Sequence, residues 1–379
     1  MSPGRGNLAP MEVASRLARL RTVVDEAGCD GLVVGHLTNV RYLTGFTGSA
    51  GLLLVRAEHA VLVTDGRYGE QAREQIGDAG VEVDVVVAGA ERHEIAAAWA
   101  VGLRRLGLEA EHVSWAEQRR LATDWFPDAE LVPTEGLVER LREHKDAGEL
   151  ARIEAAAAIA DEALARLRPR LAERPTEREV AAELEAEMRR LGADGPSFDT
   201  IVASGPNAAR PHARPTDRRL GEGDLVVIDA GALVDGYHSD MTRSYVLGDP
   251  TPIQQRMLSV VTEAQAAGVA AVRAGVAARD VDEACRSVIA AAGWADAFVH
   301  GTGHGVGLDI HEAPRVAATS DATLAAGHVV TVEPGVYLPG HGGVRVEDSV
   351  LVTTDGCRVL THAPKSTTIR PPATDPGTR

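Results

Sequence analysis

Two stretches of this chain share one layout, and each places two carboxylates beside apolar strands. Residues 225–246 and residues 329–352 both read as an apolar run, a glycine-containing turn and a returning run. That order predicts two β-hairpins. In each hairpin one acidic residue ends the first strand and a second lies on the return strand: Asp229 with Asp240, and Glu333 with Glu347. The repetition predicts two related halves that meet at one site.

These carboxylates need a compensating charge. An acidic side chain at the end of an apolar strand is costly to bury unless a cation neutralises it. For a single such residue, a solvated strand end or a salt bridge is the better explanation. Four of them in paired hairpins favour divalent metal ions instead.

A glycine-rich segment between the hairpins supplies nitrogen ligands. Residues 298–314 contain His300, His304 and His311. Glycine alternates with other residues from 301 to 307, which disfavours a helix and excludes a helical i,i+4 histidine pair. Glycine instead allows backbone and imidazole to approach a cavity closely.

Carboxylate oxygens with one imidazole nitrogen favour hard or borderline ions such as Mn²⁺, Co²⁺ or Zn²⁺. Two ions bridged by shared carboxylates would hold a water or hydroxide between them, at a pKa lowered to about 7. The residues therefore predict metal-assisted hydrolysis.

The order of elements predicts two domains. Strand-like runs alternate with helical patches up to about residue 106, which predicts an α/β domain over residues 11–140. The charged segment 140–154 is interpreted as a link with a solvated face. A second domain, of α+β type, is expected over residues 146–365. Its helices are expected at 153–171, 177–191, 252–273 and 278–292.

The composition limits which binding partners and which cellular compartment are expected. The formal charge of −16 disfavours nucleic acid and anionic membranes. The three cysteines contain no CxxC pair, which disfavours a disulfide framework or a cysteine zinc site. The first ten residues lack an apolar signal segment, and no apolar run is long enough to cross a membrane. We therefore expect a cytoplasmic protein.

Five motifs in fixed order resemble the pita-bread metallopeptidases, a family that contains aminopeptidase P, prolidase and methionine aminopeptidase. The motifs are residues 229–231, 237–243, 300–312, 333–335 and 344–348, and the resemblance extends over about residues 11–362. It implies a creatinase-like α/β N-terminal domain before a pita-bread catalytic domain. It also implies two metal ions, with Mn²⁺ favoured over Co²⁺ or Zn²⁺, and a set of five ligands: Asp229, Asp240, His304, Glu333 and Glu347.

The resemblance also implies a role for each ligand. Asp240 and Glu347 would bridge the metals, and Asp229 would complete the coordination of one of them. His304 and Glu333 would complete that of the other, and Glu333 would also shuttle protons.

Further residues resemble the proline-specific branch of this family. Residues 205–212 resemble its substrate loop, with His212 near the scissile peptide. His300 and His311 resemble histidines that line the proline pocket and steady the tetrahedral intermediate. Arg345 resembles an arginine that pairs with the substrate or with an acidic residue of the site.

The expected function is therefore hydrolysis of the Xaa-Pro bond at the N-terminus of proline-containing peptides. Residues 39–51 resemble aminopeptidase P more than prolidase and favour an Xaa-Pro aminopeptidase; in the family this domain, here with Arg41 and Tyr42, helps to build a homodimer. The alternative is an Xaa-Pro dipeptidase (prolidase), in which an arginine would hold the substrate carboxylate. Its candidates are Arg41, Arg67, Arg210 and Arg214. A third hypothesis is a metal-free binding module of the same fold, although none of the five ligands is replaced.

Overall fold

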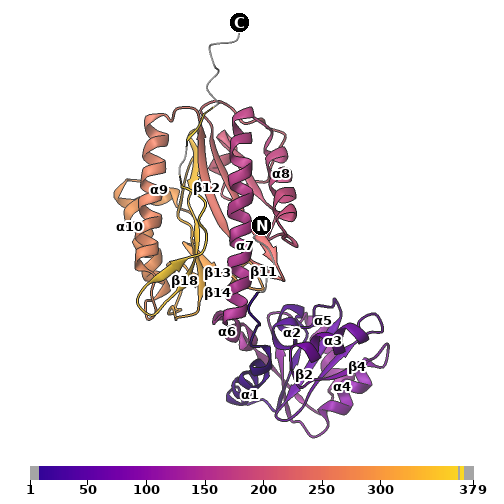
Figure 1. Ribbon diagram of the computed structural model, residues 1–379. Coiled ribbons are helices and arrows are strands. Elements are labelled where there is room, and N and C mark those ends of the chain that lie inside the picture. Colours follow the sequence, from indigo (N-terminus) through magenta and orange to yellow (C-terminus); the bar gives the residue numbers. More distant parts are fainter. Residues whose placement is uncertain (1–7, 366–367, 371–379) are drawn as a thin grey trace. The chain divides into compact units, whose positions relative to one another are not determined.

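The computed structural model describes residues 8–365 and 368–370. Contacts divide the chain into two compact units (Figure 1). The N-terminal unit spans Pro10–Arg142, and the C-terminal unit comprises the chain from Glu143 together with Leu8 and Ala9. Among the described residues, no helix is both long and apolar enough to cross a membrane.

The N-terminal unit is built on one six-stranded mixed sheet with the strand order β4-β3-β2-β1-β5-β6. The apolar runs at residues 31–34, 51–55 and 60–64 form the neighbouring strands β1, β2 and β3, as predicted. The strands are β1 (Gly31–Val34), β2 (Gly51–Arg56), β3 (Ala60–Thr64), β4 (Asp84–Val87), β5 (Arg105–Glu109) and β6 (Glu130–Thr134). Strand β1 runs antiparallel to β2 and parallel to β5. Helix α2 (Leu37–Thr44) connects β1 to β2, whereas β2 and β3 form an antiparallel hairpin.

Six α-helices accompany this sheet in the described chain: α1 (Arg16–Glu26), α2 (Leu37–Thr44), α3 (Gly69–Asp78), α4 (Arg92–Ala100), α5 (Trp115–Arg120) and α6 (Leu137–Glu143). Trp99 of α4 packs on the sheet beside Leu54 and Leu106. The prediction that a helix continues to about residue 106 is wrong, because α4 ends at Ala100. Gly102 adopts a φ of 85°, which ends the helical path, and strand β5 follows.

The C-terminal unit contains both predicted hairpins as the centres of two sheets. In the first sheet, β9 (Leu225–Ala230) pairs antiparallel with β12 (Met241–Leu247), so that Asp229 lies opposite Thr242. In the second, β15 (Val329–Val332) pairs antiparallel with β18 (Asp348–Val352). The sheets are completed by β8 (Ile201–Ser204) and β20 (Thr368–Ile369), and by β13 (Gly303–Gly305), β14 (Glu312–Val316) and β19 (Cys357–Val359).

Each long hairpin carries a shorter one at its tip, so the duplication extends beyond the two carboxylate pairs. The first tip pairs β10 (Ala232–Val234) with β11 (Tyr237–His238), and β10 also pairs with β7 (Gly195–Pro196). The second tip pairs β16 (Gly335–Leu338) with β17 (Gly342–Arg345). The two halves meet along their return strands, where Ser244 Oγ donates to the Arg345 carbonyl at 2.8 Å.

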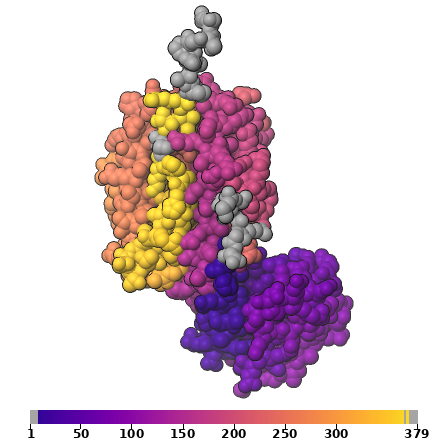
Figure 2. Space-filling model, in the orientation of Figure 1, coloured from indigo at the N-terminus to yellow at the C-terminus, as the bar shows by residue number. Residues whose placement is uncertain are grey.

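A pair of helices packs against each half. Helices α7 (Ala147–Leu167) and α8 (Glu177–Arg190) cover the first hairpin, and α9 (Pro252–Ala271) and α10 (Ala278–Ala291) cover the second. The two pairs flank the strands in Figure 1. In Figure 2, the C-terminal part of the chain is a yellow band between them. Thr176 caps α8 in a capping box with Glu179, at the predicted start of that helix.

The charged segment that leads into the C-terminal unit is not simply a solvated face, which corrects the expectation from its sequence. Arg142 and Glu149 are each only 2% exposed. The Arg142 guanidinium donates to Asn39 Oδ1 at 2.9 Å, and Glu149 accepts from the Tyr237 hydroxyl at 3.0 Å. Charges at helical spacing do not reveal which of them have buried polar partners elsewhere in the chain.

One buried carboxylate at the start of α8 fastens the loop after β8. Glu177 is 0% exposed. It accepts hydrogen bonds from the backbone and hydroxyl of Ser204 at 2.8 and 2.7 Å, and from the backbone and hydroxyl of Thr216 at 2.9 and 2.6 Å. Both Asn207 contacts are 3.1 Å long. The loop with His212 is therefore closed at both ends by one side chain.

We expect Glu177→Ala to lower the free energy of unfolding of the C-terminal unit by about 3 kcal/mol or more, because each buried donor left without an acceptor costs about 1–3 kcal/mol. Urea unfolding followed by circular dichroism measures this change. Glu185→Ala is the matched control, since Glu185 lies on the same helix and has no side-chain hydrogen bond among the described residues. Equal unfolding midpoints for both variants would contradict the assigned role.

Candidate active site

One cavity in the C-terminal unit collects most of the predicted site residues. Its volume is about 320 Å³. All five predicted ligands line it, together with three of the other predicted site residues: Asp229, Asp240, His304, Glu333 and Glu347, with His212, His311 and Arg345. The cavity lies where the tips of the two hairpins meet, because each carboxylate is at or beside the end of a strand.

The carboxylates converge although they come from both halves of the unit. Asp240 and Glu347 are 5% and 1% exposed. One ligand atom from each of Asp240, His304 and Glu347 lies within 4.8 Å of the others. A Thr242 hydroxyl, one residue beyond Met241 on the first return strand, donates to Glu347 Oε2 at 2.6 Å. The first half thus orients a carboxylate of the second.

His304 is held with one ring nitrogen facing the carboxylates. Its Nδ1 donates to the Gly305 carbonyl at 3.0 Å, which leaves Nε2 3.5 Å from both Asp240 Oδ2 and Glu333 Oε1. Burial lowers the pKa of His304 to about 4, so the imidazole is neutral at pH 7. A neutral imidazole fixed through Nδ1 presents its Nε2 lone pair, as a metal ligand must.

The glycines beside His304 are required by close backbone contacts. A Cβ on Gly303 would lie 2.0 Å from the Thr331 carbonyl oxygen, and one on Gly305 would lie 2.2 Å from that of Ala313. Neither position tolerates a side chain. The glycine-rich segment therefore forms strand β13, which brings His304 against the neighbouring strands as expected from its sequence.

Arg345 is the cation that joins these groups. Its Nη2 donates to Asp229 Oδ2 at 2.6 Å, its Nε donates to the Thr242 hydroxyl at 3.0 Å, and its Nη1 donates to the Tyr337 hydroxyl at 2.9 Å. Asp229 is thus an acidic partner of Arg345, and the predicted pairing of Arg345 with the substrate stays a prediction. Thr242 and Tyr337 were not predicted as site residues, and strand alternation alone did not single them out.

The carboxylates lack enough positive charge around them. Burial raises the pKa of Glu333 to about 8. The positive charge of Arg345 opposes this rise, and the negative charge of Asp229 adds to it. Burial, followed by repulsion from Glu333 and Asp229, raises the pKa of Glu347 well above its usual value. Burial and repulsion from Glu347 do the same for Asp240. One guanidinium does not balance four carboxylates.

The same residues fit divalent cations. Within the described part of the chain, Asp229 Oδ1 and Glu347 Oε1 are buried and have no hydrogen-bond partner. Buried polar atoms are rarely left in this state without an ion or water. Carboxylate oxygens with one imidazole are the donor set of Mn²⁺, Co²⁺ or Zn²⁺.

His300 does not line the cavity. Its Nδ1 donates to the Gly301 carbonyl at 2.8 Å, so its Nε2 accepts from the Tyr337 hydroxyl at 2.9 Å. Burial lowers the pKa of His300 to about 4 and raises that of Tyr337 to about 12, so both are neutral. His300 therefore reaches the cavity through Tyr337 and Arg345, and its predicted contact with the substrate stays a prediction.

His311 lies at the cavity, with its ring centroid 4.3 Å from that of His304. The next residue, Glu312, forms an ion pair with Lys145 at 2.6 Å, and both side chains are almost fully buried. This pair anchors the segment that carries His311. Sequence reasoning missed it because the partners are 167 residues apart.

Comparison with known proteins assigns the chain to a family. Residues 16–144 match the creatinase/prolidase N-terminal domain, and residues 151–354 match metallopeptidase family M24. An uncharacterized peptidase of Bacillus subtilis is 41% identical over 92% of this chain and 98% of its own length. An Xaa-Pro dipeptidase of Pyrococcus horikoshii is 35% identical over 91% and 96%.

Solved structures share the same two-domain fold. An Xaa-Pro dipeptidase from Bacillus anthracis superposes with a TM-score of 0.90 at 40% identity, over 94% of this chain and 99% of its own. An X-Pro aminopeptidase from Thermotoga maritima superposes with a TM-score of 0.83 at 34% identity, over 90% and 98%. The N-terminal unit is thus creatinase-like, and the C-terminal unit is a pita-bread domain. The chain belongs to metallopeptidase family M24.

Proposed function

We propose that this protein is an Xaa-Pro dipeptidase that uses two divalent ions, with Mn²⁺ favoured over Co²⁺ or Zn²⁺. The observation that carries the proposal is the convergence of four carboxylates and one neutral imidazole on a single cavity. Asp240 and Glu347 would each contact both ions, Asp229 would complete one coordination shell, and His304 and Glu333 would complete the other. An intact ligand set argues against a metal-free binding module.

The proposal of a dipeptidase differs from the sequence-based expectation of an aminopeptidase. Residues 39–51 favoured the aminopeptidase, but the Pyrococcus horikoshii relative and the Bacillus anthracis structure both carry the name Xaa-Pro dipeptidase. The cavity volume of about 320 Å³ is near the lower end of the about 300–1,000 Å³ typical of small-ligand pockets. Arg214 lines this cavity with a 90% exposed side chain, 3.9 Å from the Asp199 carboxylate, and can exchange that partner for a substrate carboxylate.

Two bound ions would supply a water of lowered pKa and polarise the scissile carbonyl. Glu333 lies at the cavity, where its carboxylate would accept a proton from the attacking water and pass it to the leaving proline nitrogen. His212 and His311 lie at the cavity, where they can donate to the developing oxyanion. Arg345 orients Asp229 and, through Thr242, Glu347.

Proline selectivity has a physical basis in the same cavity. The imide nitrogen of an Xaa-Pro bond carries no hydrogen, and the ring fixes φ near −65°. Phe198, Pro215 and Ile310 line the cavity and provide apolar surface for such a ring. A homodimer and a cytoplasmic location stay predictions. The three free cysteines, two of them buried, are in keeping with a reducing compartment.

The substrate proposal is tested by comparing kcat/KM for Ala-Pro, Ala-Pro-amide and Ala-Pro-Ala on the Mn²⁺-loaded enzyme. We expect Ala-Pro to be the best substrate, because its free carboxylate can be held at the cavity. Faster cleavage of the amide and the tripeptide would identify an aminopeptidase instead. Absence of cleavage for all three, with metal bound, would reject proline-specific hydrolysis.

Removal of the metal ions should abolish activity, and reloading the protein with metal should restore it. We expect protein stripped with a strong chelator to lose hydrolysis of Ala-Pro and to melt at a lower temperature, because ions that bind only the folded state stabilise it. Adding Mn²⁺ should reverse both changes. Full activity in protein shown to be metal-free by elemental analysis would refute the two-ion proposal.

Glu347→Gln should separate catalysis from stability. Loss of an outer-shell partner of a metal commonly costs about 10–100-fold, so replacement of a ligand should cost more than about 100-fold in kcat. In metal-free protein the variant should melt no lower than the unsubstituted chain, because an uncompensated buried charge is removed. Glu263→Gln, an exposed change on α9, is the control. Retention of a tenth of kcat by Glu347→Gln would place the chemistry elsewhere.

A further inference from the structure

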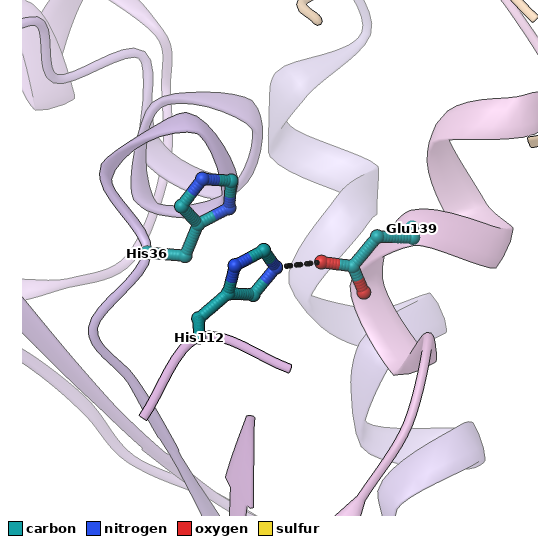
Figure 3. A group of neighbouring side chains, drawn as sticks. All are labelled: His36, His112 and Glu139. Atoms are coloured by element: carbon teal, nitrogen blue, oxygen red, sulfur yellow. Dashed lines mark hydrogen bonds and ion pairs between the residues drawn. The ribbon is translucent and has the colours of Figure 1, made fainter. Parts of the chain in front are cut away.

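A second group of potential metal ligands lies in the N-terminal unit, and the peptidase function does not use it. His36 directly precedes α2, His112 follows β5, and Glu139 belongs to α6. Figure 3 shows the two imidazoles one above the other, with the edge of His112 turned toward the Glu139 carboxylate. The ring centroids are 3.7 Å apart, the planes differ by 9°, and His112 Nε2 is 3.0 Å from Glu139 Oε1.

The atoms are close enough to share one ion. One ligand atom from each of the three residues lies within 4.8 Å of the other two. Two ligands about 2.0–2.1 Å from a tetrahedral Zn²⁺ lie about 3.3 Å apart, close to the observed distance between His112 and Glu139. An ion lies in the plane of each imidazole that binds it. One of the stacked rings must therefore turn about its Cβ–Cγ bond for both to bind.

Hydrogen bonds from buried neighbouring residues position this cluster of two histidines and one glutamate. Asn39 Nδ2 donates to Glu139 Oε1 at 2.6 Å and to Glu109 Oε1 at 2.7 Å. Glu109 Oε2 in turn accepts from the backbone N–H groups of Gly35 and His36, at 2.8 and 2.9 Å. Asn39 is 0% and Glu109 6% exposed. Outer-shell hydrogen bonds of this kind orient the ligands of metal sites.

The local charge favours a cation. Glu109 and Glu139 share the amide of Asn39, and Arg142 contributes one positive charge through its bond to Asn39 Oδ1. The two carboxyl groups outnumber the one guanidinium beside them.

We propose that His36, His112 and Glu139 bind one Zn²⁺ ion, with water as the fourth ligand. Two imidazoles and one carboxylate are a known donor set for zinc with an open position. The ion takes the place of the proton between His112 Nε2 and Glu139. These two side chains are 30% and 23% exposed, which leaves access for the ion and its water. The site ties three separate segments of the N-terminal unit together and is independent of the peptidase cavity.

The test counts zinc in the full-length protein after equilibrium dialysis against Zn²⁺ and elemental analysis. The double variant His36→Ala/His112→Ala should bind one zinc ion fewer per chain than the unsubstituted protein. The control His59→Ala/His93→Ala removes two other histidines of the same unit, 40% and 46% exposed, and should bind as many as the unsubstituted protein. Equal zinc content in all three proteins would overturn the proposal and leave a hydrogen-bonded cluster without an ion.

A milder substitution guards against misfolding. Glu139→Gln keeps an acceptor for Asn39 but removes the carboxylate, so it should also lose one zinc ion while circular dichroism stays unchanged. Added Zn²⁺ should raise the melting temperature of the N-terminal unit in the unsubstituted and control proteins more than in Glu139→Gln. A folded Glu139→Gln variant with full zinc content and an equal melting shift would likewise overturn the assignment.

Discussion

The repulsion among four carboxylates, of which those of Asp240 and Glu347 are buried, is the constraint around which the C-terminal unit is arranged. One guanidinium, that of Arg345, lies among them and binds Asp229. Strand β9 of the first half and strand β15 of the second are almost wholly buried. A pair of helices covers each half. The hydrophobic stability of those layers permits a cluster that is unfavourable until cations enter it.

The sequence predicted those features that depend on residues close together in the chain. Asp229 and Glu333 were recognised because each ends an apolar strand, and α8 was expected over residues 177–191, close to its observed bounds. Contacts between distant segments were not predictable in this way. The approach of Tyr337 to His300 and the burial of Lys145 against Glu312 depend on how the halves pack. Substrate length likewise depends on loops and on cavity volume, which strand periodicity does not encode.

The two candidate metal sites differ in depth and in donor atoms, so they should select ions differently. The peptidase cavity offers mainly carboxylate oxygens, among them those of the almost fully buried Asp240 and Glu347. The N-terminal cluster offers two imidazoles, of which that of His112 is partly exposed. Oxygen-rich sites suit Mn²⁺, whereas imidazole-rich sites suit zinc and its neighbours. The order of the ions is generally the same at such sites, so the two sites should differ in how strongly each prefers Zn²⁺ over Mn²⁺.

The bonds that assemble the peptidase cavity join residues far apart in the chain. Arg345 binds Asp229 across 116 residues, and Thr242 binds Glu347 across 105. During synthesis the first hairpin emerges well before the second, and its carboxylates stay in water, where their charges cost little. The low-dielectric cavity exists only once the second hairpin has docked against the first, because both supply its carboxylates. The charges, and the site for any ions, therefore come together only after both halves have been synthesised.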